Sequence, residues 1–262
     1  MWRVSAVKLL ALLPFILNLN IMKTLERSMI NRVTQPELVW QELTRLPTVE
    51  AAARQVAEAY DFRCHPYLVW MQADTTDRRE FLHSQTPFCF AVESFSQALA
   101  AVLARMPLLE ARMSLAENVA EEHGHGEYLR SHKQTFRQYL LALGATEAIL
   151  ETPCPIAILA FNQSILTYCL SQSGESGAAL LGMIEYLYIG ISSAIAATLE
   201  QRNWVAPGSQ SHYAVHEQLD TQHARELLNL AEPAWQETRT RLQVAQGLVL
   251  GGHYFWSLYR DL

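Results

Sequence analysis

The spacing of apolar residues is the feature that most constrains how this chain can fold. They recur at intervals of three and four, as on one face of an α-helix, rather than alternating as along a half-buried strand. Runs of β-branched residues joined by Asn-Gly or Asp-Gly turns, which mark hairpins, are missing from the sequence. We therefore predict an almost wholly α-helical protein. Its prolines are expected at helix boundaries, at Pro36, Pro47, Pro66, Pro87, Pro107, Pro153, Pro155, Pro207 and Pro233.

Capping signals, such as Thr76 followed by Asp77, mark several expected helix starts. No unit of 20 to 50 residues repeats, which argues against a solenoid. Long helices with short connections predict a bundle whose interior can hold a site. The expected helices cover residues 37–60, 77–105, 108–123, 126–144, 156–172, 176–202, 209–230 and 233–258.

Length and charge narrow the class of protein. The chain has 262 residues, half of them hydrophobic, which suits one large domain with a sizeable core. A net charge of -6 without basic runs argues against nucleic acid or an anionic membrane as the main partner. We expect a small-molecule substrate, and the chain could also form a homodimer.

The cysteines are far apart and form no CxxC pair, which argues against a zinc ribbon or a thioredoxin-like redox motif. They are expected to be reduced, mostly buried thiols of a cytoplasmic protein. These residues are Cys64, Cys89, Cys154 and Cys169.

The first residues, MWRVSAVKLLALLPFILNLNIM, are apolar with early positive charges. Their uninterrupted apolar run, 9–17, is shorter than the roughly 20 residues that span a bilayer, and no small-x-small cleavage site follows. We therefore expect no stable membrane span and favour an upstream start or a loosely attached segment over secretion. Residues 1–30 are treated as an N-terminal extension apart from a single helical domain over 31–262.

The stretch HYAVHEQLDTQH, residues 212–223, has a spacing that suits a metal site. On an α-helix, His216, Asp220 and His223 lie within about 60° of one another along roughly 10 Å of the axis. Imidazole nitrogens and a carboxylate on one face can bind one or two metal ions. The competing interpretation is a solvated helix face with two incidental histidines, and the spacing alone does not decide between them.

A second group of ligand-type residues lies in ENVAEEHGHGEYLRSH, residues 117–132, most of which must be solvated. Glu122 and His132 lie about 15 Å apart along an unbroken helix, too far for both to bind one centre. The two glycines of the intervening GHG indicate a helix break, which removes this objection. Glu121 in place of Glu122, and His125 in place of His132, remain alternatives.

A single carboxylate, Glu185, interrupts the apolar segment ALLGMIEYLYIGISSAIAATLEQ. A buried ionised carboxylate is costly unless it is paired or bound to metal. The alternative is an exposed stripe on an amphipathic helix, for which the apolar neighbours leave little room. We therefore expect Glu185 to be buried with a partner.

Together these stretches supply three carboxylates and three imidazoles from four helices. The mixture lacks thiolate, so it suits iron or manganese better than structural zinc. Carboxylate-rich sites inside helical bundles commonly hold two irons. The candidate metal ligands are Glu122, His132, Glu185, His216, Asp220 and His223.

The segment NVAEEHGHGEYLRSHKQTFRQYLLALGA resembles the signature of the iron-containing redox enzymes with a haem-oxygenase-like fold. That signature runs Asn, two residues, [DE]-E-x-G-x-G, then His and an amphipathic helix ending in Leu and Gly. Glu185 and HxxxDxxH follow in the family's order, and the resemblance covers most of residues 60–258. It implies an all-α, seven-helix, haem-oxygenase-like bundle in which the six candidates correspond to the family's iron ligands. The matching positions are Asn118, Glu121, Glu122, Gly124, Gly126, His132, Leu141 and Gly144.

The same resemblance implies a non-haem diiron oxidase or oxygenase of biosynthesis. Two labile Fe(II) ions, with Mn as an alternative, would activate O2 to oxidise an amine, an amino acid or a fatty acid. Pocket walls are expected from residues 65–95 and 186–191. A wholly apolar pocket would favour a lipid or alkyl substrate, whereas His83, Gln85 or Glu93 facing inward would favour an amine or amino acid.

Two other interpretations stay open. A non-catalytic helical metal- or ligand-binding protein would bind metal without consuming O2. A thiaminase-like enzyme on the same fold would need Cys154 or Cys169 in the cavity. Haem oxygenase itself is least expected, because three carboxylates in a porphyrin-sized gap would have no role.

Overall fold

The computed structural model describes residues 40, 42–206 and 211–262; within 211–220 it describes the side chain of Tyr213 only. The described residues belong to one compact unit, Glu37–Leu262. The extension expected over residues 1–30, and its boundary with 31–262, lie outside the described part of the chain.

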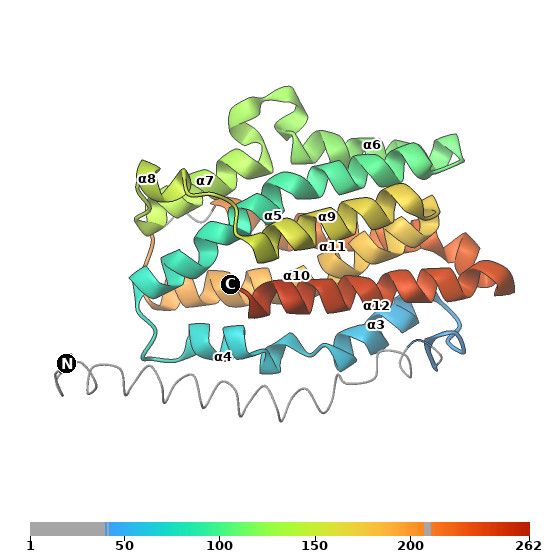
Figure 1. Cartoon of the computed structure of the whole chain (residues 1–262), viewed down its shortest axis with the longest axis horizontal. Coiled ribbons are helices and arrows are strands. Elements are labelled where there is room, and N and C mark those ends of the chain that lie inside the picture. The colour runs from blue at the N-terminus through green and yellow to red at the C-terminus, as the bar shows by residue number, and fades with distance from the viewer. Residues whose placement is uncertain (1–39, 41, 207–210) are drawn as a thin grey trace, which may run out of the picture. The chain divides into compact units, whose positions relative to one another are not determined.

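The described chain is α-helical and contains no strand, which confirms the predicted fold class (Figure 1). Short 3-10 turns join some of the helices: η1 (Phe62–Cys64), η2 (Gly124–Gly126) and η3 (Tyr128–Arg130). The helices are α3 (Val49–Ala59), α4 (Pro66–Gln72), α5 (Arg78–Arg105), α6 (Leu109–Glu122), α7 (His132–Leu143), α8 (Glu147–Leu150), α9 (Ile156–Ser171), α10 (Gly174–Gln201), α11 (Ser211–Gln236) and α12 (Thr238–Arg260).

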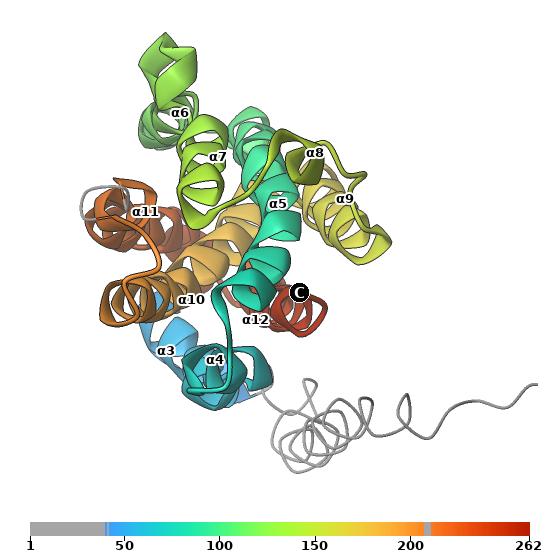
Figure 2. The same cartoon turned by 90° about the vertical axis from the view of Figure 1, so that its left-hand side faces the viewer.

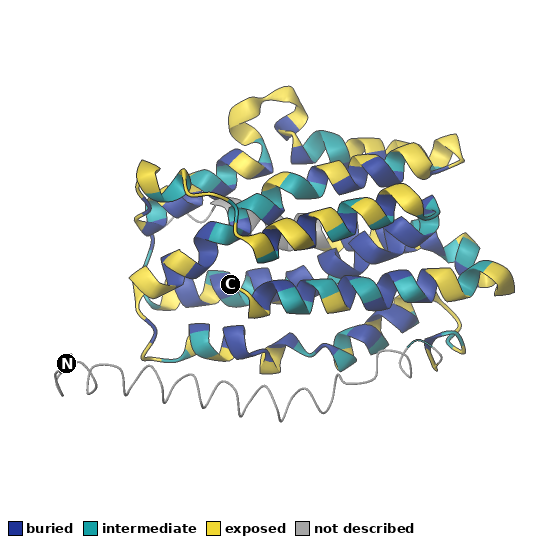
Figure 3. Cartoon of the chain, viewed as in Figure 1, coloured by how far each residue is buried: buried dark blue, intermediate teal, exposed yellow. Residues whose placement is uncertain are grey.

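Helix α10 is the central element of this bundle. Helices α11 and α12 pack along it, and α5 contacts it while also packing against α6, α7 and α9 (Figure 2). Helices α5 and α10 are long and apolar enough to cross a membrane by these two criteria alone. Most of α10 is buried inside the protein, however, so its apolar composition is that of a core helix (Figure 3).

The start of the bundle differs from the expected helix over 37–60. Helix α3 begins only at Val49, because Thr48 caps it by accepting a hydrogen bond from the Ala51 N–H at 3.2 Å. The short helix α4, which was not expected, starts with Pro66 in its first turn, where proline is tolerated. Helix α8 was also not expected.

Two prolines contradict the prediction that proline marks helix boundaries. Pro87 lies inside α5 and Pro233 lies inside α11. A proline inside a helix costs about 3 kcal/mol, and buried packing on either side of both positions outweighs that local cost. The break expected at residue 233 therefore falls at Glu237, the residue before α12.

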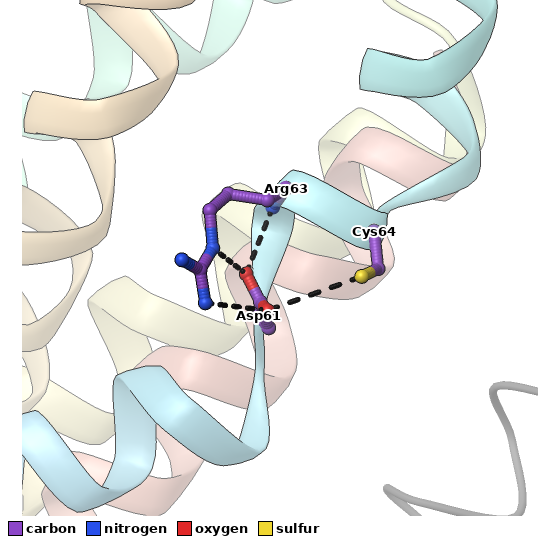
Figure 4. A network of polar contacts seen from close by, with 3 residues as sticks. All are labelled: Asp61, Arg63 and Cys64. Atoms are coloured by element: carbon purple, nitrogen blue, oxygen red, sulfur yellow. Dashed lines mark hydrogen bonds and ion pairs between the residues drawn. The ribbon is translucent and has the colours of Figure 1, made fainter.

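The turn between α3 and α4 is fixed by Asp61 (Figure 4). Its carboxylate accepts hydrogen bonds from the backbone N–H of Arg63 at 3.1 Å and from the guanidinium Nε and Nη2 at 2.8 and 2.9 Å. These bonds lower the pKa of Asp61. The exposed Cys64 lies beside them, its Sγ 3.9 Å from Oδ2 of Asp61.

Candidate metal centre

The GHG turn between α6 and α7 is a true helix break, as predicted. Gly124, His125 and Gly126 have φ angles of 64°, 52° and 86°, in the left-handed region. A Cβ on Gly124 would lie 2.6 Å from the backbone carbon of Arg130, so only glycine allows this close return. The turn thus brings the start of α7 back to the end of α6.

This return places the last residue of α6 against the first residue of α7. Nδ1 of His132 lies 2.9 Å from Oε1 of Glu122. The two residues are only 8% and 7% exposed, so they meet in the interior rather than at the surface. Their distance is compatible with binding to one centre, whereas an unbroken helix would have kept the two residues about 15 Å apart.

Glu185, on the central helix α10, is 6% exposed, which confirms the prediction that it is buried. It lines one cavity of about 60 Å³ together with Glu122 and His132. Three of the six candidate ligands therefore line a single, partly open cavity, contributed by α6, α7 and α10.

Helix α11 packs closely against the part of α10 that carries Glu185. The two helices are antiparallel, because α10 is about 42 Å long and the connection from Gln201 to Ser211 can reach at most about 36 Å. A Cβ on Gly182 would lie 3.0 Å from Cβ of Leu227, so glycine permits this close contact. Glu185 follows Gly182 by one turn and His223 precedes Leu227 by one turn. Antiparallel packing therefore sets these two residues at similar heights.

His223 is almost fully buried, at 1% exposure. Its Nε2 lies 2.6 Å from Oε2 of Glu121, which links α11 to the end of α6. The other candidates on α11, His216 and Asp220, belong to the helix, but their side chains lie outside the described residues.

The alternatives within residues 117–132 differ in burial. Glu121 is not among the described residues that line the cavity and instead contacts His223. The side chain of His125 is 51% exposed, with Nδ1 3.9 Å from Glu117. Ligand atoms of Glu117, Glu121 and His125 lie within 4.8 Å of one another, but this group is largely exposed, as acidic clusters without metal often are. Burial therefore favours Glu122 and His132 as the pair that faces the cavity.

The donor set in the cavity fits a metal cation. Two carboxylates and one imidazole share an interior space whose other walls are mainly hydrocarbon. With both carboxyl groups ionised, the three side chains remain net negative even when His132 is protonated. Such a charge is costly in a low-dielectric interior, and a divalent cation would neutralise it. Oxygen and nitrogen donors suit iron or manganese.

The walls come partly from the expected segments. Phe88, Ala91, Val92 and Phe95 of α5 and Tyr188 of α10 contribute, whereas the described residues of α4 do not. Phe161, Phe255 and Leu258 also line the cavity, and nothing in their local sequence distinguishes them from ordinary core residues. The described wall residues other than the candidate ligands are Phe88, Ala91, Val92, Phe95, Phe161, Ile184, Tyr188, Phe255 and Leu258.

None of the three polar residues that would have indicated an amine or amino acid substrate lines the cavity. His83 and Glu93 are exposed, and Glu93 forms an ion pair with Lys133. Gln85 is buried, but it is hydrogen-bonded to tyrosines instead. Within the described residues, the cavity therefore matches the apolar case.

The cysteines offer no thiolate to this cavity. Neither Cys154 nor Cys169 is among the described residues that line it, and burial raises the pKa of the Cys169 thiol to about 12. All four cysteines are free thiols. The prediction that they are mostly buried is wrong, because only Cys169 is buried and Cys64 is exposed.

Comparison with known proteins finds relatives by sequence and by fold. The model of the iron-containing redox enzyme family matches residues 79–251. The 4-aminobenzoate synthase of Chlamydia muridarum is 27% identical over 172 residues, which cover 64% of this chain and 71% of that protein. The 4-aminobenzoate synthase of Chlamydia trachomatis serovar D is 27% identical over 169 residues, or 63% and 71% of the two chains.

Two solved structures share the fold. A domain with a haem-oxygenase-like fold from Shewanella denitrificans has a TM-score of 0.68 at 13% identity, covering 82% of this chain and 92% of that one. A TenA homologue from Pseudomonas syringae pv. tomato has a TM-score of 0.65 at 14% identity, covering 84% and 95%. These likenesses confirm the haem-oxygenase-like bundle, and the family match extends over most of it. The chain belongs to the family of iron-containing redox enzymes.

Proposed function

We propose that this protein is a non-haem diiron enzyme that uses O2 to oxidise a small organic substrate with an apolar body. The observation that carries the proposal is that three buried side chains, Glu122, His132 and Glu185, line one cavity whose other walls are mainly apolar. His216, Asp220 and His223 of α11 would complete the ligand set. Manganese in one or both positions is the alternative metal content.

The ligands would also set the conditions for loading the site. Glu122 and His132 contact each other directly through Oε1 and Nδ1, so a metal ion held by both side chains would compete with that contact. Because an imidazole binds metal only when deprotonated, loading should release a proton when His132 starts out protonated. Bound iron would supply the electrons that reduce O2 and the oxidising power directed at the substrate.

Glu121 has a supporting role in this proposal. Its carboxylate lies 2.6 Å from Nε2 of His223, and donation of an Nε2–H to it would leave Nδ1 as the nitrogen that can bind a metal, although His223 is not among the described residues that line the cavity. A hydrogen bond from the second ring nitrogen to a carboxylate commonly fixes the orientation of a ligand histidine.

The walls of the cavity would select the substrate. Phe88, Phe161 and Phe255 present hydrocarbon to the space beside the carboxylates, which excludes water and favours an alkyl or aromatic body. The cavity of about 60 Å³ is partly open, so a larger substrate would extend out of it or displace wall side chains. The Chlamydia relatives are named for making 4-aminobenzoate, an aromatic acid, which is consistent with an aromatic ring in such a site.

A thiaminase-like activity is the second candidate, since TenA homologues share the fold. That activity would need a cysteine in the cavity, and none of the described residues that line it is a cysteine. For that reason we favour the diiron proposal. We also propose a cytoplasmic location for the enzyme, and homodimer formation remains a prediction.

The proposal is tested by anaerobic reconstitution with Fe(II), followed by exposure to O2 with absorbance and iron stoichiometry as readouts. Wild type should bind close to two irons and change its absorbance with O2. His132→Ala should lose iron, whereas His125→Ala, which alters an exposed histidine of the same segment, should behave as wild type. Failure of wild type to bind iron, or loss in the His125 variant alone, would overturn the assignment. Metal binding without O2 consumption would favour the non-catalytic alternative.

A further inference from the structure

A second buried polar cluster lies outside the cavity and centres on Gln85 of α5. Its Nε2 donates to Oη of Tyr67 at 2.6 Å, and its Oε1 accepts from Oη of Tyr213 at 2.8 Å and Oη of Tyr139 at 3.3 Å. We call these four residues the Gln85 hub. Each of them is at most 5% exposed.

The protons of the hub can be followed in one direction. Tyr139 and Tyr213 donate to Oε1 of Gln85. The Nε2 of the same amide donates to Oη of Tyr67. Tyr67 then lies 2.9 Å from Oγ of Ser84, which itself donates to a backbone carbonyl. Burial raises the pKa of Tyr67 and of Tyr139, so these hydroxyls stay protonated and able to donate. These hydrogen bonds link one buried amide to three tyrosine hydroxyls.

The hub joins helices that carry candidate metal ligands. Tyr139 follows His132 by seven residues, two turns along the same face of α7. Tyr213 precedes His216 by three residues at the start of α11. The rings of Tyr139 and Tyr213 are also in edge contact, with centroids 5.0 Å apart. Figure 2 shows α5, α7 and α11 around α10, so the hub ties the two ligand helices to a common support.

We infer that Gln85, Tyr139 and Tyr213 are positioning residues for the proposed metal site, holding α7 and α11 at the separation that metal binding needs. This inference rests on the proposed function. The other interpretation of the hub is a network that only stabilises the fold. The two differ in what happens to metal affinity when one hydroxyl is removed from a helix with ligands or from a helix without them.

Tyr67 supplies the matched control, because its helix α4 carries no candidate ligand. Tyr213→Phe and Tyr67→Phe each delete one buried hydroxyl from the same amide. Fe(II) affinity is measured anaerobically by chelator competition on the full chain, and the unfolding midpoint of each metal-free variant is measured alongside. Tyr213→Phe should weaken Fe(II) binding about tenfold, the lower end of the effect of removing a direct hydrogen-bond partner from a metal ligand, and Tyr67→Phe roughly threefold or less.

The outcomes separate this inference from the proposed function. Equal Fe(II) affinity of the two variants, with wild type binding iron, would overturn the positioning role while leaving the diiron site standing. A wild type that binds no iron would overturn both. If Tyr213→Phe does not fold, Tyr139→Phe on α7 takes its place, since it removes the longest of the three hydrogen bonds. It too must weaken Fe(II) binding more than Tyr67→Phe for the inference to hold.

Discussion

The carboxylate cavity and the Gln85 hub are both buried polar clusters, but they satisfy their polar atoms in different ways. The hub consists of neutral groups, and each hydrogen bond within it ends on another group of the protein. The cavity gathers ionisable groups of which two are carboxylates. Neutral donors and acceptors can be completed by the chain alone, whereas clustered carboxylates need a positive charge as well.

This difference indicates that the cavity, and not the hub, depends on a bound cation. Removing one partner from a buried neutral network leaves the remaining polar groups without their hydrogen bonds, which destabilises the metal-free fold. Removing a carboxylate from a negative cavity relieves repulsion and desolvation, so the metal-free fold need not suffer. Stability in the absence of metal should therefore depend on the hub, and stability in its presence on the cavity.

The largest expected effect is that of Fe(II) binding in the cavity on the unfolding free energy of the protein. With free Fe(II) at a thousand times its dissociation constant, binding to the folded state alone stabilises the protein by about 4 kcal/mol. We expect thermal unfolding under anaerobic conditions to shift upward with Fe(II) and to return after chelation. Gln85→Leu should retain part of this shift and His132→Ala should lose it. If Fe(II) left the unfolding temperature of wild type unchanged, the cavity would not depend on a bound cation.

Sequence features predicted the cavity better than the hub, because the cavity has local signals. Two glycines mark the turn that brings Glu122 to His132, and an apolar segment marks Glu185 as buried. The register of HxxxDxxH predicted a ligand face on α11, of which the described structure shows only His223.

What the sequence could not supply were contacts between distant elements. Phe255 reaches the cavity from the last helix, and Gln85 meets Tyr213 across 128 residues of chain. Gln85 was a candidate pocket residue by its position in the chain, yet its amide is engaged elsewhere. Similarly, Pro233 predicted a helix end that buried packing around Trp235 overrides. Such outcomes depend on tertiary packing, which no local pattern specifies.

His65 is a third case, a buried ionisable group that stays neutral, as the hub residues do. Its Nδ1 accepts from the backbone N–H of Tyr67 at 3.0 Å, its Nε2 lies 3.1 Å from the carbonyl of Trp256, and burial lowers its pKa to about 4. The unfolded chain has the higher pKa of 6.5, so stability from neutral His65 is present above pH 6.5 and lost as the pH falls towards 4. The loss over this window is about 3 kcal/mol.

This pH dependence is measured by urea unfolding of the metal-free protein between pH 7 and pH 4. His65→Asn keeps a side chain that can cap α4 but removes the titration, so its stability should fall less steeply over the window. Parallel curves for wild type and variant would show that His65 does not carry the effect.

Substitution of the hub residue is the next effect in size. Gln85→Leu removes the partner that three tyrosine hydroxyls share in a dry interior. We expect the metal-free protein to lose about 2 kcal/mol of unfolding free energy, measured by urea denaturation. His83→Leu, two residues earlier on the exposed face of the same helix, is the control and should change stability little. A variant as stable as wild type would mean that the hub hydroxyls find other partners.

The smallest effect, and the one of opposite sign, belongs to Glu185. Glu185→Gln keeps the shape of the side chain but removes one charge from the cavity that it shares with Glu122 and His132. In the metal-free protein this should leave stability unchanged or raise it by about 1 kcal/mol, while the stabilisation by Fe(II) should largely disappear. Urea unfolding with and without anaerobic Fe(II) measures both quantities on one sample. A metal-free Glu185→Gln protein that is clearly less stable than wild type would show that contacts of the carboxylate within the chain outweigh the cost of burying its charge. The distinction between the two clusters would then fail, because Glu185 would not need a cation to offset its burial.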